Sequence, residues 1–139
     1  MEIKLTKAEA EGYYYSALCN GGLQELRACG VTLDTDVNDY KAAKESLQKK
    51  LDSGEITLDL GICYEDIIME ILHIGKTLKF IDKEYDGEYS REVTLEMVHE
   101  KVAKTPIRHL TDYIKENDDA ITAFVLLQAV MYDGEMIFA

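Results

Sequence analysis

The stretch AITAFVLLQAVM, residues 120–131, decides the fold that we expect for this chain. At helical spacing its large apolar side chains point to all sides of the axis instead of forming one stripe. Such a helix must be covered all round, because an exposed apolar face promotes aggregation. It is either a central core helix or a helix whose outer side, with Leu126 and Val130, forms a subunit interface. As a helix it is about 18 Å long, too short to span a bilayer, so we expect no membrane association.

Outward from this stretch, the sequence predicts further helices and a small antiparallel sheet. Asp86-Gly87 stands between two apolar segments and is typical of a tight turn, which predicts a hairpin over residues 77–93. Asp133-Gly134 predicts another turn, followed by a C-terminal strand at residues 135–138. We therefore predict a helix-rich α+β fold with one domain over residues 1–139. The other helices are expected at residues 6–20, 39–51, 64–74, 94–104 and 105–116.

Local signals indicate where several of these elements begin and end. Thr6 and Glu9 form a capping box at the start of the first helix. Asn20-Gly21-Gly22 predicts its end, because glycine readily takes the left-handed conformation that terminates a helix. Residues 23–34 are ambiguous and favour a short hairpin that ends in a strand at 31–33. Residues 56–60 alternate between apolar and polar side chains, which is typical of a short strand.

The composition excludes several classes of protein. The 139 residues carry 27 acidic and 15 basic side chains, and the formal net charge of −12 repels a phosphate backbone, so no nucleic acid is expected as a ligand. Cys19, Cys29 and Cys63 are odd in number and lack C-x-x-C spacing, which argues against a secreted disulfide framework. No apolar run follows the N-terminal charges, so we expect a cytoplasmic protein. Glycine-rich phosphate loops and nucleophile motifs are missing from the sequence; we expect no cofactor and no enzymatic activity.

One loop carries the oxygen ligands of a candidate calcium site. Asp34, Asp36 and Asn38 alternate along it, and Glu45 stands at the twelfth position, as in an EF-hand-type loop. The sixth position is Asp39, where the sharp turn of such a loop calls for glycine. The alternative is that Asp36 or Asn38 caps the following helix. A second acidic loop, around Asp82, Glu84 and Asp86, lacks the late carboxylate and is explained equally well by the hairpin turn.

Two Glu-x-x-His pairs, Glu70–His73 and Glu96–His99, could each present two metal ligands from one helix face. We expect the two pairs to act separately. Glu70 and His73 lie opposite the isoleucine face of their helix and should face water, whereas His99 lies on the apolar side of its own helix. The predicted hairpin also separates these helices, so structural roles are favoured for both histidines.

Three consecutive tyrosines, Tyr13-Tyr14-Tyr15, occur on the first predicted helix. Three successive residues fan across about 200° of a helix, so the core cannot easily hold all three rings. Tyr13 and Tyr14 fit the apolar face, which leaves Tyr15 towards the flank. Aromatic side chains serve as anchors in protein interfaces, so Tyr15 is a candidate contact residue. A ring lying flat over its own domain is the alternative.

Three segments carry a resemblance to a known group of proteins: residues 13–21 (YYYSALCNG), 63–66 (CYED) and 118–123 (DDAITA). In them the chain resembles small uncharacterised proteins of phages and mobile elements in Bacteroides-type gut bacteria. The likeness extends over most of the chain and carries no catalytic motif. It implies a phage or mobile-element context and assigns no functional residue.

These observations favour a non-enzymatic, acidic protein-binding domain whose partner has a basic surface. Negative charge spread over the surface speeds encounter with such a partner. Two alternatives stay open. The first is a homo-oligomeric assembly component that uses the last helix and the C-terminal strand. The second is a calcium-binding protein that uses the loop at residues 34–45.

Overall fold

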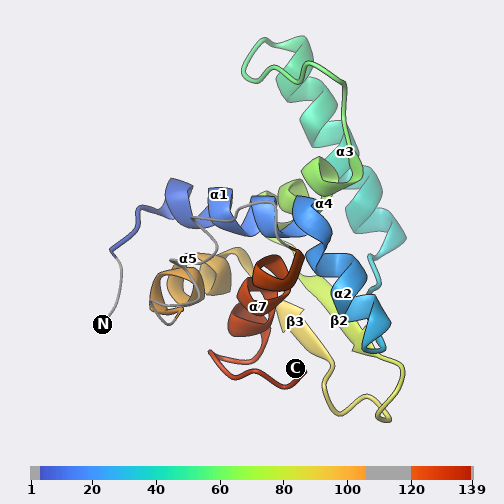
Figure 1. Ribbon diagram of the computed structural model, residues 1–139. Helices are drawn as coiled ribbons and strands as arrows, with labels where there is room; N and C mark the ends of the chain where they lie inside the picture. The colour runs from blue at the N-terminus through green and yellow to red at the C-terminus, as the bar shows by residue number, and fades with distance from the viewer. Residues whose placement is uncertain (1–3, 106–119, 139) are drawn as a thin grey trace.

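The computed structural model describes residues 4–105 and 120–138, and it has the predicted helix-rich α+β architecture (Figure 1). The prediction of one domain over residues 1–139 stays a prediction. The helix expected at 105–116 falls almost wholly outside the described residues. The helices are α1 (Lys7–Ala17), α2 (Leu23–Ala28), α3 (Val37–Asp52), α4 (Tyr64–His73), α5 (Leu95–Lys104) and α7 (Ala120–Met131), and the strands are β1 (Val31–Leu33), β2 (Leu78–Asp82) and β3 (Arg91–Val93).

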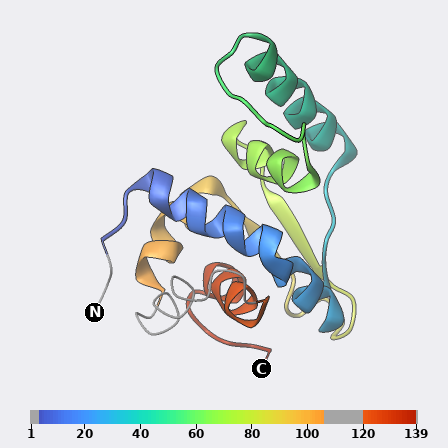
Figure 2. The same ribbon diagram turned by 45° about the horizontal axis from the view of Figure 1, so that its top comes forward.

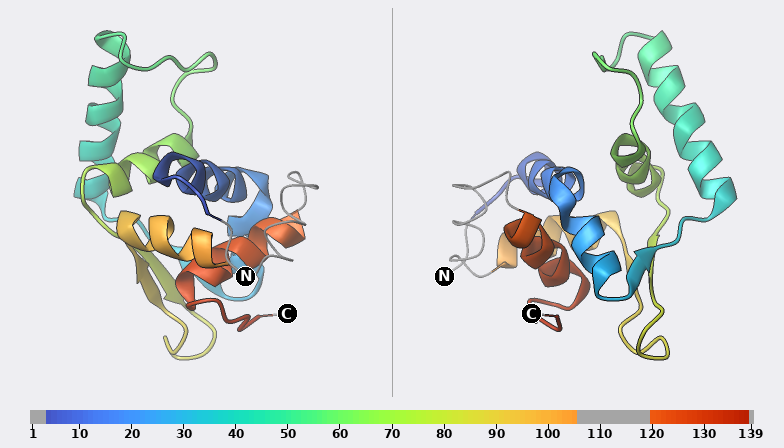
Figure 3. Two further views of the ribbon diagram at one scale, coloured as in Figure 1. Left: turned by 90° about the vertical axis from the view of Figure 1, so that its left-hand side faces the viewer. Right: turned by 45° about the vertical axis from the view of Figure 1, so that its right-hand side comes forward.

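The last helix, α7, lies in the core of the chain. Leu126 and Val130 are 1% and 0% exposed, and α7 is surrounded by α1, α2, α5, β3 and the turn that joins α1 to α2. Figure 3 shows α1, α5 and α7 grouped together, and each of these three helices contacts the other two. The chain itself therefore covers most of this helix, and the explanation as a central core helix accounts for its sequence. Leu126 and Val130 are not at the surface, where a subunit interface would need them.

The sheet has the strand order β1-β2-β3, and both pairs are antiparallel. Phe80, in the central strand, is fully buried and pairs with Leu33 on one side and Arg91 on the other. The predicted hairpin is confirmed, with β2 and β3 flanking the turn at Asp86-Gly87, where both residues have positive φ. The strand expected at 31–33 is also confirmed, as the third member of the sheet.

The C-terminal strand expected at residues 135–138 is wrong. Its backbone instead pairs with a buried side chain of α7: the Gln128 amide donates to the Phe138 carbonyl at 3.1 Å and accepts from the Phe138 N–H at 2.8 Å. The Phe138 ring packs against Tyr89, with ring centroids 5.5 Å apart. This segment therefore joins the core through a side chain and not through a sheet ladder.

The region after the first helix also differs from expectation. The capping box of Thr6 and Glu9 is confirmed, and so is the interruption of the helix at the glycine pair, where Asn20 and Gly21 leave helical φ and ψ. Gly21 has φ +91, and the chain continues through a π-helical turn, Leu18–Gly22, into α2, where a hairpin was expected. A Cβ on Gly22 would lie 2.6 Å from the Leu127 side chain, so glycine lets α7 approach this turn closely. The left-handed glycine was predicted correctly, but the chain re-enters a helix, α2, instead of the expected hairpin.

The pair α3 and α4 projects from the rest of the molecule (Figure 2). Asp36 caps α3 by accepting the N–H groups of Asn38 and Asp39, and residues 53–63 return along α3 to the start of α4. The strand expected at 56–60 is wrong, since this stretch is a loop with a turn at its end. Because α4 packs on α3, α1 and β2, it connects the projecting part to the core. Within the described ranges no helix has the length and apolarity needed to cross a membrane.

Candidate binding pocket

A pocket of about 410 Å³ lies where α1, the end of α3, the 53–63 loop and α4 meet. The residues that line it are spread over positions 11–73 of the sequence, so only the fold brings its walls together. Its apolar side is formed by Leu47, Ile56, Leu58 and Met69. Its polar side is formed by Glu11, Tyr15, Lys50, Asp66, Glu70 and His73.

Glu70 forms the buried polar floor of this pocket, with 2% of its side chain exposed. The Lys50 ammonium lies 2.8 Å from Oε2 and 3.1 Å from Oε1, and the Ser46 hydroxyl donates to Oε2 at 2.5 Å. Burial acts to raise the pKa of Glu70, but the hydrogen bonds from Lys50, Ser46 and His73 outweigh it and leave the pKa below its ordinary value. Glu70 is therefore a paired carboxylate that joins α4 to α3.

Glu11, on α1, receives both histidines of the two Glu-x-x-His pairs. Nε2 of His73 lies 2.5 Å from Oε1, and Nε2 of His99 lies 2.7 Å from Oε2. Partial burial acts to raise the pKa of Glu11, but the contacts with the two imidazoles outweigh this effect. The pKa of Glu11 is therefore below its ordinary value. Figure 3 shows α1 lying beside both α4 and α5, the helices that carry these histidines.

His73 bridges two carboxylates. Its Nδ1 lies 3.2 Å from Oε1 of Glu70, and its Nε2 contacts Glu11. Each ring nitrogen of His73 therefore contacts a different carboxylate. The result is a continuous chain of polar contacts through Lys50, Glu70, His73, Glu11 and His99, which ties α3, α4, α1 and α5 together.

The expectation that Glu70 and His73 face water is wrong for Glu70. The face of α4 opposite the isoleucines is covered by α3, which brings Ser46 and Lys50 onto it. The two histidines nevertheless meet on one carboxylate, that of Glu11, although among the described residues the two pairs do not combine into a metal site. Sequence reasoning missed Glu11, because no spacing along the chain relates this residue to either histidine.

Tyr15 and Asp66 form the other end of the polar wall. The Tyr15 hydroxyl donates to Oδ1 of Asp66 at 2.8 Å and lies 3.7 Å from the Cys63 sulfur, while the Cys63 N–H donates to Oδ2 at 3.0 Å. Partial burial and the bond to Asp66 raise the pKa of Tyr15 well above its ordinary value, so the hydroxyl stays protonated. Tyr15 is half-buried and lines the pocket, and its role as a contact residue stays a prediction.

The candidate calcium ligands have other partners. Asp36 caps α3, and Asp34 accepts from the Thr32 hydroxyl and pairs with Lys83 at 3.3 Å. Asn38 and Glu45 are exposed on α3. Across residues 4–105 and 120–138, no group of three or more His, Cys, Asp or Glu side chains is arranged to hold a metal ion.

The second acidic loop is likewise organised by hydrogen bonds. The buried Asp82 carboxylate accepts three backbone N–H groups, those of Glu84, Tyr85 and Tyr89. Burial acts to raise the pKa of Asp82, but these bonds outweigh it and leave the pKa below its ordinary value. Its role is to hold the loop of the hairpin.

Comparison with known proteins does not add to this description. No protein-family model matches the chain, and no curated protein and no solved structure matches it either. The function is therefore argued from the pocket and its surroundings, and the phage or mobile-element origin stays a prediction.

Proposed function

We propose that this protein is a non-enzymatic protein-binding domain that docks a partner with a basic surface on the pocket between α1, α3 and α4. The observation that carries the proposal is Leu60, which is 101% exposed on the same loop that supplies Ile56 and Leu58 to the pocket wall. A fully exposed leucine beside an apolar pocket is a suitable anchor for a protein contact.

The charge of the chain supports a basic partner. Acidic residues exceed basic ones by twelve over the whole sequence, and Glu11, Asp66 and Glu70 line the pocket itself. Complementary charge raises the rate of association and disfavours partners of the same sign. Polar contacts at the edge of an apolar patch are also the usual composition of a transient interface.

The two alternatives have less support. A homo-oligomer built on the last helix would need Leu126 and Val130 at the surface, and both are in the core. A calcium site at residues 34–45 would need Asp34 and Asp36 to leave their present partners.

The test is capture of a partner from a lysate of the organism that encodes the chain, with the whole chain immobilised at low salt. Leu60→Asp should abolish capture of a specific band, since it places a carboxylate at the centre of the contact. Val37→Asp is the matched control: Val37 is also an exposed apolar residue of the projecting part, 67% exposed at the start of α3. Capture that is equal for the wild type and Leu60→Asp contradicts the proposal.

A further inference from the structure

The pocket beside Leu60 has a chemistry that selects one kind of side chain. We infer that it receives a lysine side chain of the partner, with the alkyl stem along the apolar wall and the ammonium among the carboxylates. This inference rests on the proposed function and specifies what enters the pocket when the partner docks.

The first step is charge. Among the described residues that line the pocket, three carboxylates, those of Glu11, Asp66 and Glu70, face one ammonium, that of Lys50. Lys50 is already paired with Glu70. Over these lining residues the charge is therefore net negative whether His73 is neutral or protonated. A cation that enters it gains attraction in a partly enclosed space, where water screens charges less than at an open surface.

The second step is shape and polarity. The apolar side chains of Leu47, Ile56, Leu58 and Met69 line the same cavity as the carboxylates. A ligand that matches both sides has an alkyl chain and a cationic end. Lysine and arginine side chains have this character, because their methylene stems bury well against apolar surface while the charge stays on polar groups.

The third step favours lysine over arginine. A guanidinium binds best as a fork on two free oxygens of one carboxylate. Here each oxygen of Asp66 already accepts a hydrogen bond, from Tyr15 or from the Cys63 N–H, and each oxygen of Glu11 contacts a histidine. An ammonium has three donors in a tetrahedral arrangement and can use one remaining lone pair from each of several oxygens.

The carboxylates are placed for such shared contacts. Glu11 and Tyr15 are four residues apart and so lie on one face of α1, and Asp66 and Glu70 have the same spacing on α4. The Tyr15 hydroxyl donates a hydrogen bond to Asp66, and His73 contacts both Glu11 and Glu70. These contacts hold the two helix faces, one of α1 and one of α4, against each other. Asp66 is the counter-ion that we assign to the incoming lysine, since the groups that donate to it, the Tyr15 hydroxyl and the Cys63 N–H, are neutral.

The experiment is an NMR titration of the full chain, labelled at backbone nitrogen and at methionine, leucine and isoleucine methyl groups. The probe is n-butylammonium, which has the stem and head group of lysine. We expect shifts at Met69 and Leu58 with millimolar affinity, which is normal for a ligand of this size. Butylguanidinium should bind several-fold more weakly, and 1-butanol weaker still. Equal binding of 1-butanol, tighter binding of butylguanidinium, or no shift at Met69 overturns the inference.

Two variants localise the effect. Asp66→Asn should weaken n-butylammonium at least three-fold, whereas Glu45→Gln, on the exposed side of α3, should leave it unchanged. Because Asp66 also caps α4, a second variant, Leu58→Ser, removes part of the apolar wall from the loop alone and should also weaken the probe. Unchanged affinity in both pocket variants overturns the assignment.

Acetylation of the lysines of the captured partner tests whether the pocket receives a lysine side chain of that partner. Loss of capture after acetylation supports the inference, and retained capture overturns it. The proposed function fails on a different result, namely capture that does not depend on Leu60. If Leu60→Asp abolishes capture while n-butylammonium leaves the pocket methyl groups unshifted, only the assignment of lysine fails.

Discussion

His73 Nε2 lies 2.5 Å from Oε1 of Glu11, and this contact joins α4 to α1 beside the pocket. The two residues are 62 positions apart in the sequence. Through His73 the contact reaches Glu70, and through Glu11 it reaches His99. The pocket wall is therefore held by ionisable groups, which makes both its geometry and the stability of the fold depend on pH.

Acid should destabilise the protein through Glu11 and Glu70. Their pKa values in the folded chain are below the ordinary value of 4.5, so between the two values the unfolded chain binds more protons than the folded one. The stabilisation is fully present above pH 4.5 and is lost as pH falls through the lowered pKa. We expect urea unfolding to show a free energy of unfolding that drops steeply below pH 4.5. Glu11→Gln should flatten that slope, whereas Glu96→Gln, on the exposed side of α5, should reproduce the wild-type profile.

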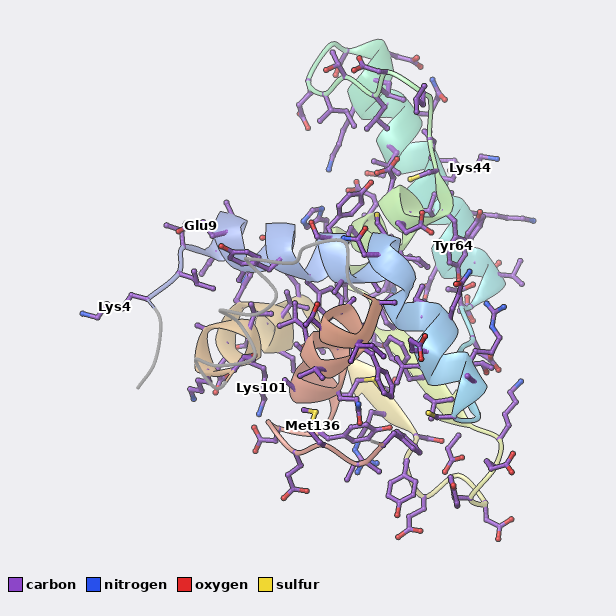
Figure 4. The ribbon with its side chains drawn as sticks, viewed as in Figure 1. Lys4, Glu9, Lys44, Tyr64, Lys101 and Met136 are labelled. Atoms are coloured by element: carbon purple, nitrogen blue, oxygen red, sulfur yellow. The ribbon has the colours of Figure 1, made fainter. Side chains whose placement is uncertain are left out.

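Lys50→Met should destabilise the fold by about 1–3 kcal/mol, because it leaves the buried Glu70 carboxylate without its ammonium partner. The matched control is Lys44→Met, on the same helix, since the Lys44 side chain extends into solvent (Figure 4). Chemical unfolding at neutral pH measures both. Adding Glu70→Leu to Lys50→Met should recover much of the loss, because an apolar pair replaces the unpaired charge. A neutral effect of Lys50→Met alone would show that Glu70 needs no cation.

Gly22→Ala should cost about 1–3 kcal/mol, although Gly22 has ordinary helical φ and ψ. The added Cβ would lie 2.6 Å from Cδ1 of Leu127 and 2.7 Å from the Ala17 carbonyl oxygen. Gly12→Ala is the control, since a Cβ there meets nothing within 4 Å and should raise stability by about 0.5–1 kcal/mol. Thermal unfolding of both variants measures the difference. If both substitutions raise the stability by the same amount, α7 does not pack closely on this turn.

Gln128→Leu should release the C-terminal segment from the core. It removes both hydrogen bonds to the Phe138 backbone, while Phe138 keeps its ring contact with Tyr89. We expect faster hydrogen exchange at the Phe138 amide and a loss of about 1–3 kcal/mol in the free energy of unfolding. Gln48→Leu, on the exposed face of α3, should change neither quantity. Undiminished protection at Phe138 would assign the docking of this segment to the aromatic contacts.

Short-range signals predicted much of the secondary structure. The capping box at Thr6, the hairpin turn at Asp86-Gly87 and the helix expected at 94–104, which Thr94 caps, appear in the structure where the sequence placed them. Each depends on a few neighbouring residues whose preferred backbone angles and hydrogen bonds agree with the fold. The exceptions are residues 23–28, 56–60 and 135–138, and at 135–138 the Gln128 side chain of α7 takes the place of a strand partner.

The pocket could not be predicted in the same way. The pattern of α4 correctly placed its isoleucines in the core, but it could not show that α3 covers the opposite face. The two Glu-x-x-His pairs drew attention to His73 and His99, yet the group on which they meet, Glu11, has no sequence relation to them.

By itself, the sequence determined the α+β class, the hairpin and the need to cover residues 120–131 on all sides, because periodicity and turn chemistry act between neighbours along the chain. The tertiary structure alone decided which strand completes the sheet and which charges share the pocket. Those outcomes depend on contacts between residues tens of positions apart, and the energy of such a contact exists only once the helices have packed.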